Sequence, residues 1–418
     1  MTDAAALAAR WRTAAPRLAG WPALEAGLAL LAMLLFSQAL LGPLLADPAD
    51  PDGGAVLRLI WPPVYLLALG LIALNPAPVL RTAARAWPLL LLGALTLISS
   101  AWSIDPGLTL RRGLAVVMTL VFALWLAARY SWADLIRLVA LMFAILAAGS
   151  FIAGAAFPGF GIMSEVHVGA WKGLWWEKNT LGGYMAFAAA AFCAAAAAAP
   201  SRGERRVWLA LVGLAVLLVV LSTSRTALLA LMICTAGPAG IALARRGFGF
   251  AVLAVFSGLS GLGALAGVLV IGPGVILEAL GRDPTLTGRT EIWAALGEAI
   301  AARPWTGYGY GAFWEVDDGP VFWVRQAAVW PVPTAHNAWL ETALSLGLPA
   351  MAFAMIVVLT GWLRAVTRLF CGVETYWALP FLTAWIGVSL SESNLLVQNG
   401  VVWMLLSATL AKLAARPR

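Results

Sequence analysis

Charged residues are scarce in this sequence. Asp, Glu, Lys and Arg together make up 11% of its 418 residues, whereas hydrophobic residues make up 62%. An ordinary soluble domain carries about a quarter charged residues, so the composition excludes that class. Apolar runs recur at membrane length, and a helix spans a bilayer because it satisfies its own backbone hydrogen bonds. The sequence therefore predicts an all-α, polytopic transmembrane helical bundle that forms a single integral membrane domain over residues 1–418.

Cysteines and clustered acidic residues are also few. The three cysteines, Cys193, Cys234 and Cys371, are scattered and form no CxxC pair. This spacing argues against a disulfide framework and against a zinc site. The only adjacent acidic pair, Asp317-Asp318, stands alone in a polar loop, whereas a Mg²⁺ site needs carboxylate oxygens placed together. We therefore expect neither a metal nor a cofactor.

About twelve stretches are long and apolar enough to be membrane spans. They cover roughly residues 22–45, 55–74, 87–103, 109–128, 133–156, 178–199, 207–222, 226–244, 248–272, 336–360, 375–392 and 398–413. The stretch 273–335, between the ninth and the tenth, is polar and predicts one large loop. Residues 1–20 contain three arginines but no apolar core, so we expect no cleaved signal peptide.

The distribution of Lys and Arg orients the chain. With the N-terminus inside, ten of the 27 Lys and Arg residues fall outside, and the remaining 17 fall inside or just within a span. Cytoplasmic loops carry such an excess, so both termini are predicted to be cytoplasmic and the 273–335 loop extracytoplasmic. The net charge of +7 reflects this bias, so the expected partner is a lipid bilayer and not a nucleic acid. The ten outer cations are Arg58, Arg111, Arg112, Lys172, Lys178, Arg225, Arg282, Arg289, Arg303 and Arg325.

Several outer cations stand at predicted helix starts. Lys178 begins the sixth span and Arg225 the eighth, and Arg289 falls in the first turn of a helix within the large loop. Helix N-termini offer free N–H groups and the positive end of the dipole, which bind anions. A cation is locally unfavourable there. Its repeated placement predicts an anionic ligand, although each cation alone is also explained as an interfacial anchor.

The helix of the large loop is expected to be amphipathic, with Gly288 as its N-cap and its end near Ala302. Its apolar residues recur at helical spacing and share one face. They are Ile292, Trp293, Leu296 and Ile300. A helix this short does not span a bilayer, so it should lie over the outer mouth of the bundle.

A segment rich in glycine and aromatic residues follows this helix. It covers residues 305–311 and includes Tyr308. Aromatic side chains presented by tight turns suit contact with the faces of sugars. Turn formation alone also explains the glycines, so both interpretations stand.

One of the two histidines lies where the large loop meets the tenth span. Thr334 is the expected N-cap, so His336 should begin the spanning helix. The positive end of the helix dipole disfavours the imidazolium form, and a neutral imidazole can accept a proton. The alternative is an interfacial histidine that is held by hydrogen bonds. The second histidine, His167, stands in no motif and is expected to be structural.

These residues resemble the O-antigen ligase and Wzy-type polysaccharide polymerase superfamily of bacterial membrane glycosyltransferases. The segment 391–396, with Asn399 and Trp403, resembles the exopolysaccharide polymerase branch more than the ligase branch. The matching pieces follow the family's order from about residue 99 onward. They are Trp102-Ser103-Ile104-Asp105-Pro106, Gly173 with Lys178-Asn179-Thr180-Leu181-Gly182, Ser222-Thr223-Ser224-Arg225, Gly288-Arg289-Thr290 with Trp293, Pro304 and Gly307-Tyr308-Gly309, and His336-Asn337 with Leu340-Glu341 and Gly347-Leu348.

The resemblance implies a glycosyltransferase that acts without a metal at the outer face of the bacterial inner membrane. It would move a glycan from an undecaprenyl diphosphate carrier to an acceptor sugar hydroxyl, alongside other polysaccharide assembly proteins. Its motifs imply catalytic roles for Arg225, Arg289 and His336. The implied substrate-binding residues are Lys178, Asn179, Asn337 and Tyr308.

The chemistry of these residue types agrees with that implication. A diphosphate leaving group gathers negative charge, and arginine stays charged and matches phosphate oxygens in pairs. Glu341 lies five residues after His336, about 140° around a helix, so we do not expect it to orient that ring directly. Glu25 and Glu392 are acids within or beside predicted spans, which makes them candidate site residues without an assigned role.

Three alternatives remain at this level. A ligase would share the donor but pass the glycan to the lipid A-core. A secondary transporter or flippase would also have about twelve spans, and it should show repeated halves and ionisable groups near the bilayer midplane. Here the unusual charges lie at the outer ends, and one loop is far longer than the others. A scaffold without catalytic activity leaves the outer cations unexplained.

Overall fold

The computed structural model describes residues 21–45, 55–165, 167–271, 289–315, 319–328 and 332–415. Within these ranges the chain is helical, and the single β-type pairing is one antiparallel bridge between Ile162 and Trp171. The prediction of an all-α polytopic bundle is confirmed. Gly288, Asp317-Asp318 and the first 20 residues lie outside the described residues, as do the side chains of Arg289 and Thr290.

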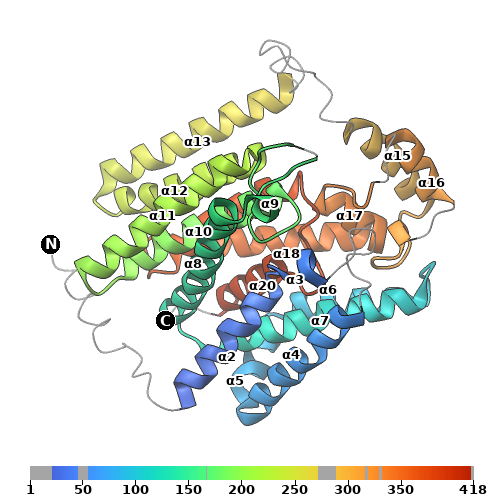
Figure 1. Cartoon of the computed structure of the whole chain (residues 1–418), viewed down its shortest axis with the longest axis horizontal. Helices are drawn as coiled ribbons and strands as arrows, with labels where there is room; N and C mark the ends of the chain where they lie inside the picture. Colours follow the sequence, from blue (N-terminus) through green and yellow to red (C-terminus); the bar gives the residue numbers. More distant parts are fainter. Residues whose placement is uncertain are drawn as a thin grey trace.

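The helices follow one another with short connections (Figure 1). The first half of the chain contains α2 (Trp21–Phe36), α3 (Leu41–Leu45), α4 (Ala55–Leu74), α5 (Pro76–Arg85), α6 (Trp87–Ile98), α7 (Pro106–Arg129), α8 (Trp132–Ala156), α9 (Pro158–Gly161) and α10 (Lys178–Ala198). The second half contains α11 (Arg202–Ser222), α12 (Arg225–Ala244), α13 (Phe248–Ile271), α15 (Arg289–Ala302), α16 (Pro320–Ala328), α17 (Ala338–Leu346), α18 (Leu348–Thr367), α19 (Thr375–Ser389) and α20 (Val401–Leu413).

Seven of the described helices are long and apolar enough to cross a membrane, namely α4, α7, α8, α10, α11, α12 and α18. The pair α5 and α6 adds an eighth if it is one span, although it bends by 86° at its break. Each of the twelve predicted stretches contains helix, but α2, α19 and α20 have 16, 15 and 13 residues. A straight crossing takes about 20 residues. The protein is therefore a multi-pass membrane protein, and the count of twelve spans stays a prediction.

The predicted tenth span is wrong at its start. The sequence predicted one helix over residues 336–360, whereas the structure has α17 and α18, divided at Gly347 with φ 87°. A Cβ at residue 347 would clash with the carbonyl group of Trp305, and Leu348 N donates to Pro304 O at 2.7 Å. Only glycine adopts this conformation without strain. The membrane-length helix is therefore α18, and α17 is a separate short helix before it.

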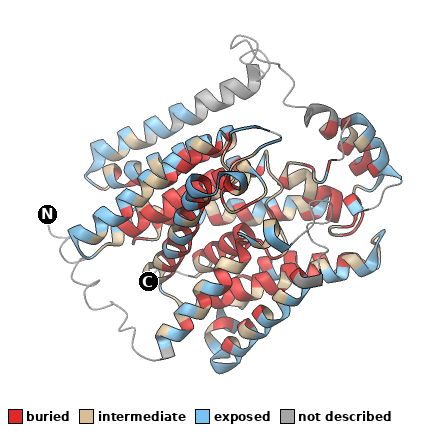
Figure 2. Cartoon of the chain, in the orientation of Figure 1, coloured by how far each residue is buried: buried red, intermediate tan, exposed pale blue. Residues whose placement is uncertain are grey.

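The core of the bundle is built around α10, which packs against α8, α11, α12 and α19. Its alanines at 188–191 and 194–196 are all buried. Small side chains let neighbouring helices approach closely in a membrane. Figure 2 shows buried residues along α10 and α20 and exposed ones along the periphery. Many peripheral residues are large and apolar, such as Leu59 and Leu66 on α4, as a lipid-facing surface requires.

An ion pair joins the start of α2 to the end of α7. Arg129 donates from Nε and Nη2 to the two carboxylate oxygens of Glu25, at 2.6 and 2.8 Å. The ammonium group of Lys412 on α20 donates to the carbonyl oxygens of Ala127 and Tyr130 nearby. Glu25, a site candidate by its sequence position, is therefore a structural residue.

The described parts of the large loop have a hydrophobic core of their own, separate from that of the bundle. Ile292, Leu296 and Ile300 of α15 are buried in it, and Trp293 packs against it, so the predicted amphipathic face is confirmed. Val321 and Val324 of α16 belong to the same cluster, as do Ala343 and Leu344 of α17. We call this unit, residues 289–315, 319–328 and 332–335, the cap. Figure 1 shows α15 and α16 grouped beside α17.

The predicted orientation is testable with a cysteine that the chain already carries. Cys371 is exposed between α18 and α19, on the side predicted to be cytoplasmic. A membrane-impermeant thiol reagent should label it only after cells are permeabilised. In a Cys371→Ala background, a new cysteine at Trp323 of the cap, which is 69% exposed, should be labelled in intact cells. Labelling of Cys371 in intact cells would invert the orientation.

Candidate functional site

Two predicted cations begin their helices as expected. Lys178 is the first residue of α10, and Arg225 is the first residue of α12. Gly182, one turn into α10, brings these starts together, because a Cβ there would lie 2.7 Å from both Ser222 Oγ and Ala227 Cβ. The first turn of α10 therefore lies directly against the junction of α11 and α12.

That junction is a tight reversal of only two residues. Thr223 ends α11 in the left-handed conformation with φ 54°, and the Ser224 hydroxyl caps α12 by accepting from Ala227 N at 3.4 Å. Serine at an N-cap satisfies an N–H group that the helix leaves unpaired. Lys178 Nζ donates to Thr223 Oγ1 at 3.2 Å. The reversal therefore holds Lys178 and Arg225 on the same side of the bundle.

The two cations are close but have no counter-ion. Their positive charges repel each other, and neither forms a salt bridge within the residues that the structure describes. Arg225 is exposed, and the amide of Asn179 makes no hydrogen bond to the described chain. Two cations at two helix starts, where the dipole is also positive, form an anion-binding arrangement.

His336 lies two residues before its helix and not at the first helical position. The N-cap of α17 is Asn337, whose Oδ1 accepts from Trp339 N and Leu340 N at 2.9 and 3.1 Å. The predicted cap, Thr334, is therefore wrong, because the asparagine nearer the helix satisfies these N–H groups instead. His336 has φ 47°, a conformation in which histidine is tolerated.

The loop between α19 and α20, residues 390–400, joins the histidine to the cation pair. Asn337 Nδ2 donates to Leu390 O at 3.2 Å, and Asn337 N donates to Ser393 Oγ at 3.3 Å. Between these contacts, Ser391 Oγ donates to Thr226 Oγ1 at 3.4 Å, next to Arg225. His336 and Arg225 are thus each one residue from a contact with this loop, and Glu392 lies between those contacts. Because both polar groups of the Asn337 side chain are engaged, Asn337 is placed to position His336.

The helix that Arg289 begins is held against the same place. Trp293 Nε1 donates to Ala335 O, the residue before His336, at 2.9 Å. Arg289 is the first residue of α15 and one turn before Trp293. The predicted position of Arg289 at a helix start is therefore confirmed, and that start lies beside the His336 segment. The start of α15 thus lies beside the His336 segment, and the 390–400 loop links that segment to the start of α12.

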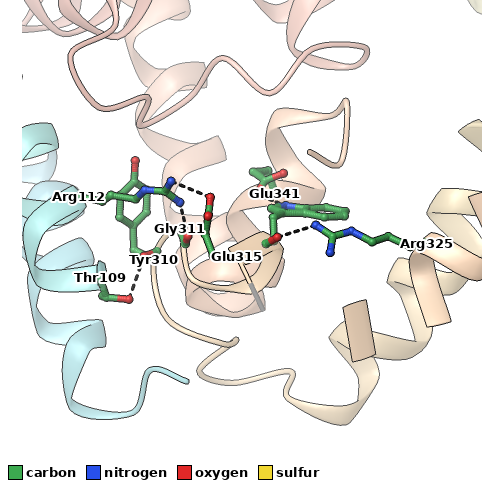
Figure 3. A network of polar contacts seen from close by, with 8 residues as sticks. Thr109, Arg112, Tyr310, Gly311, Glu315, Arg325 and Glu341 are labelled. Atoms are coloured by element: carbon green, nitrogen blue, oxygen red, sulfur yellow. Dashed lines mark hydrogen bonds and ion pairs between the residues drawn. The ribbon is translucent and has the colours of Figure 1, made fainter. Parts of the chain in front are cut away.

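Glu341 controls the backbone before His336, as the close-up in Figure 3 partly shows. Its Oε2 accepts from Ala335 N at 2.8 Å, and its Oε1 accepts from Trp314 Nε1 at 2.9 Å. Arg325 fixes Trp314 in turn, donating to its carbonyl oxygen at 2.7 Å. Burial raises the pKa of the Glu341 carboxyl, and these hydrogen bonds and the charge of Arg112 lower it in part. The sequence analysis considered only a direct contact between the Glu341 side chain and the His336 ring. It did not predict this indirect contact through the backbone of Ala335.

The remaining motifs join the cap to the bundle through hydrogen bonds and one salt bridge, and we call this set of contacts the clasp. Trp102 Nε1 donates to Thr306 O at 2.8 Å, and Ile104 N donates to Tyr308 O at 3.1 Å. Arg112 of α7 donates to Gly311 O at 2.6 Å and forms a salt bridge with Glu315 at 2.7 Å (Figure 3). Pieces about 200 residues apart in the sequence are therefore in direct contact.

Tyr308 is part of this clasp. Only 3% of it is exposed, its hydroxyl donates to Ala299 O at 2.9 Å, and its ring packs edge-on against Phe313. Gly307 and Gly309 both have positive φ. The structure thus places Tyr308 in the core of the cap, where it fixes the glycine-rich turn. His167 lies elsewhere, exposed in the loop between α9 and α10.

Comparison with known proteins follows the same segments. A family profile described as O-antigen ligase, Wzy_C, matches residues 209–355, which include Arg225, Arg289 and His336. The chain is also 29% identical, over 292 residues, to the exopolysaccharide production protein ExoQ of Rhizobium meliloti (strain 1021). This alignment covers 65% of the chain and 63% of the relative. The chain therefore spans less than two thirds of that relative's length.

The contact between Glu341 and Ala335 gives a prediction about the backbone before His336. A Glu341→Gln variant cannot accept at both oxygen positions, so the Ala335 amide should exchange its hydrogen faster. A hydrogen bond to a charged group contributes about 1.5–3 kcal/mol, which corresponds to about tenfold or more in exchange rate. Thr342→Val is the matched control, because Thr342 donates only within α17, to Ala338 O. Equal exchange at Ala335 in the wild type and Glu341→Gln would contradict the anchoring role.

Proposed function

We propose that this chain, which belongs to the O-antigen ligase and Wzy-type polymerase superfamily, transfers a glycan from an undecaprenyl diphosphate carrier to an acceptor sugar hydroxyl. The observation that carries the proposal is the pairing of Lys178 and Arg225 at two adjoining helix starts, linked through the 390–400 loop to Asn337 beside His336. One anion-binding element and one proton acceptor are what this reaction needs.

The transfer needs an attacking oxygen, a proton acceptor and a stabilised leaving group. The acceptor oxygen forms a bond to the anomeric carbon while the bond from that carbon to the diphosphate oxygen breaks. His336 takes the proton of the hydroxyl as general base. The electron pair remains on the diphosphate, where Lys178, Arg225 and Arg289 stabilise the charge that develops. Asn179, at the start of α10, hydrogen-bonds the donor.

Polymerisation of exopolysaccharide repeat units is the favoured form of this reaction. The relative reported above is an exopolysaccharide production protein, and the 390–400 loop that carries the polymerase-like segment frames the site. A ligase that passes the glycan to lipid A-core is the second candidate, favoured by the description of the matching family profile. In either case the site faces the outside of the inner membrane, with both termini cytoplasmic, and other polysaccharide assembly proteins supply the donor.

The base assignment is tested at His336. Because His336 has positive φ, His336→Asn keeps a residue that tolerates this conformation but removes the proton acceptor, and His336→Gln keeps more of the size. Both variants should lose transfer by about a hundredfold to ten-thousandfold and still bind the donor. Transfer is measured with purified lipid-linked donor in the presence of EDTA, with His167→Gln as the control. A wild-type rate in His336→Asn would sink the assignment.

Lysine variants test the leaving-group assignment, because they keep the positive charge of the arginine side chain and change its shape. Arg225→Lys and Arg289→Lys retain a cation but lose the planar fork that matches two phosphate oxygens. Loss of one charge-assisted hydrogen bond, about 1.5–3 kcal/mol, should slow transfer by about tenfold or more in each variant. Arg303→Lys, at the far end of α15, is the matched control. Full glycan output from both lysine variants would show that charge alone suffices there.

A further inference from the structure

A cavity lies at the N-terminal ends of α4 and α7. Its volume is about 270 Å³, close to the lower end of the range for ligand pockets. Its walls come from the turn between α2 and α3, from α4, from α7 and from the end of the 390–400 loop. Arg58, Trp61, Arg111 and Asn399 line it, whereas Lys178, Arg225 and His336 do not. Arg112, which joins α7 to the cap, also lines it.

The wall at Asn399 is rigidly built. Tyr65 donates its hydroxyl to Asn399 Oδ1 at 2.6 Å, and Gln38 Nε2 donates to Asn399 O at 3.1 Å. Asn399 N donates to Thr119 Oγ1 at 3.2 Å, and its φ is 51°. Three elements thus hold one left-handed asparagine in place. Its Nδ2 donates to no acceptor within the described chain, so the cavity is fitted with an uncommitted hydrogen-bond donor.

The cavity also contains two uncommitted guanidinium groups. Arg58 and Arg111 are exposed, and neither forms a salt bridge or a hydrogen bond with the described residues. The topological charge bias gives no reason for arginines on this side of the membrane. Guanidinium groups match phosphate oxygens in pairs, and Trp61, which stacks with Phe36 and Tyr65, adds a flat apolar face. The chemistry selects a phosphorylated ligand that also carries an apolar or sugar ring surface.

The cavity is connected to the His336 site through shared elements. The 390–400 loop holds Asn337 at its start and forms the cavity wall at Asn399 near its end. On another side, Gly42 lines the cavity and lies in close contact with the ring of Trp176, two residues before Lys178. A ligand in the cavity is therefore held by the same segments that frame the reacting groups.

We infer that this cavity binds the diphosphate end of a second lipid-linked glycan, the acceptor. The inference rests on the proposed function, because polymerisation joins two glycans that each carry a lipid diphosphate. Two separate anion-binding places are then required. Lys178 and Arg225 hold the donor diphosphate, whereas Arg58, Arg111 and Asn399 hold the acceptor.

Binding stoichiometry separates the two places. The full chain in lipid nanodiscs is titrated with radiolabelled undecaprenyl diphosphate, and the wild type should bind two molecules. Arg58→Gln combined with Arg111→Gln should bind one, with the other weakened at least tenfold. Arg81→Gln combined with Arg85→Gln, an equal charge loss at exposed positions of α5, should still bind two. One molecule on the wild type, or two on the Arg58/Arg111 variant, would overturn the inference.

A second double variant keeps both positive charges and so tests the binding role with less risk of misfolding. Arg58→Lys combined with Arg111→Lys keeps both charges and should still weaken one of the two binding events, because the planar forks are lost. Wild-type binding of both molecules by this variant would count against the assignment. Inorganic diphosphate is added as a competitor to distinguish a free anion from a lipid. If inorganic diphosphate displaces undecaprenyl diphosphate from the cavity at an equal concentration, the lipid-linked assignment is wrong.

Transfer assays distinguish this inference from the proposed function. If the wild type polymerises lipid-linked repeat units and the Arg58/Arg111 variants do so with an unchanged half-saturating acceptor concentration, the cavity assignment fails and the function stands. If the wild type binds two molecules but transfers no glycan, the function fails and the cavity stands. The expected result is an acceptor half-saturation at least tenfold higher in the Arg58/Arg111 variants, with the donor value unchanged.

Discussion

The close contact of α10 with the junction of α11 and α12 is the constraint on which the site depends. It exists because Gly182 has no side chain where a Cβ would meet Ser222 and Ala227. Two positive helix ends and two cations are thereby held together, an arrangement that is repulsive until an anion occupies it. The alanine-rich packing of α10 deep in the bundle holds the two cations in place against this repulsion. Under the proposed function, the core thus holds the two cations in place for an anionic ligand.

The described cations include some with a partner in the protein and some without an ion pair. Arg129 pairs with Glu25, Arg137 pairs with Glu204, and Arg245 donates to the carbonyl oxygen of Leu369. These contacts hold helices together. Among the described cations without an ion pair, Lys178 and Arg225 begin two adjoining helices, and Arg58 and Arg111 line one cavity. Their grouping in pairs distinguishes these four.

The cap extends this arrangement, because glycine-dependent turns and main-chain hydrogen bonds fix it to the bundle. The contacts between α7 and the 305–311 segment and the break at Gly347 together hold the cap and α17 against the bundle. Glu341 and Trp293 then hold Ala335 from both its N–H and its carbonyl side. His336 is therefore positioned through its backbone, by residues that need not touch its ring. Under the proposed function this anchoring matters, since a displacement of a catalytic group by about 1 Å can cost a hundredfold in rate.

Composition and hydrophobic periodicity alone determined that the chain is an α-helical membrane bundle with an amphipathic helix in its large loop. Local signals also located the helix starts at Lys178, Arg225 and Arg289, because N-cap residues and the onset of an apolar pattern both lie within a few residues of a helix start. The start of α17 was misplaced, since two polar residues compete for one cap and a single Gly347 divides an apolar run. Only the tertiary structure brought Thr226, Ser391 and Asn337 together and created the cavity at Arg58 and Arg111. Such contacts join segments between 56 and 334 residues apart, and no periodicity within one segment records which distant segment it will meet.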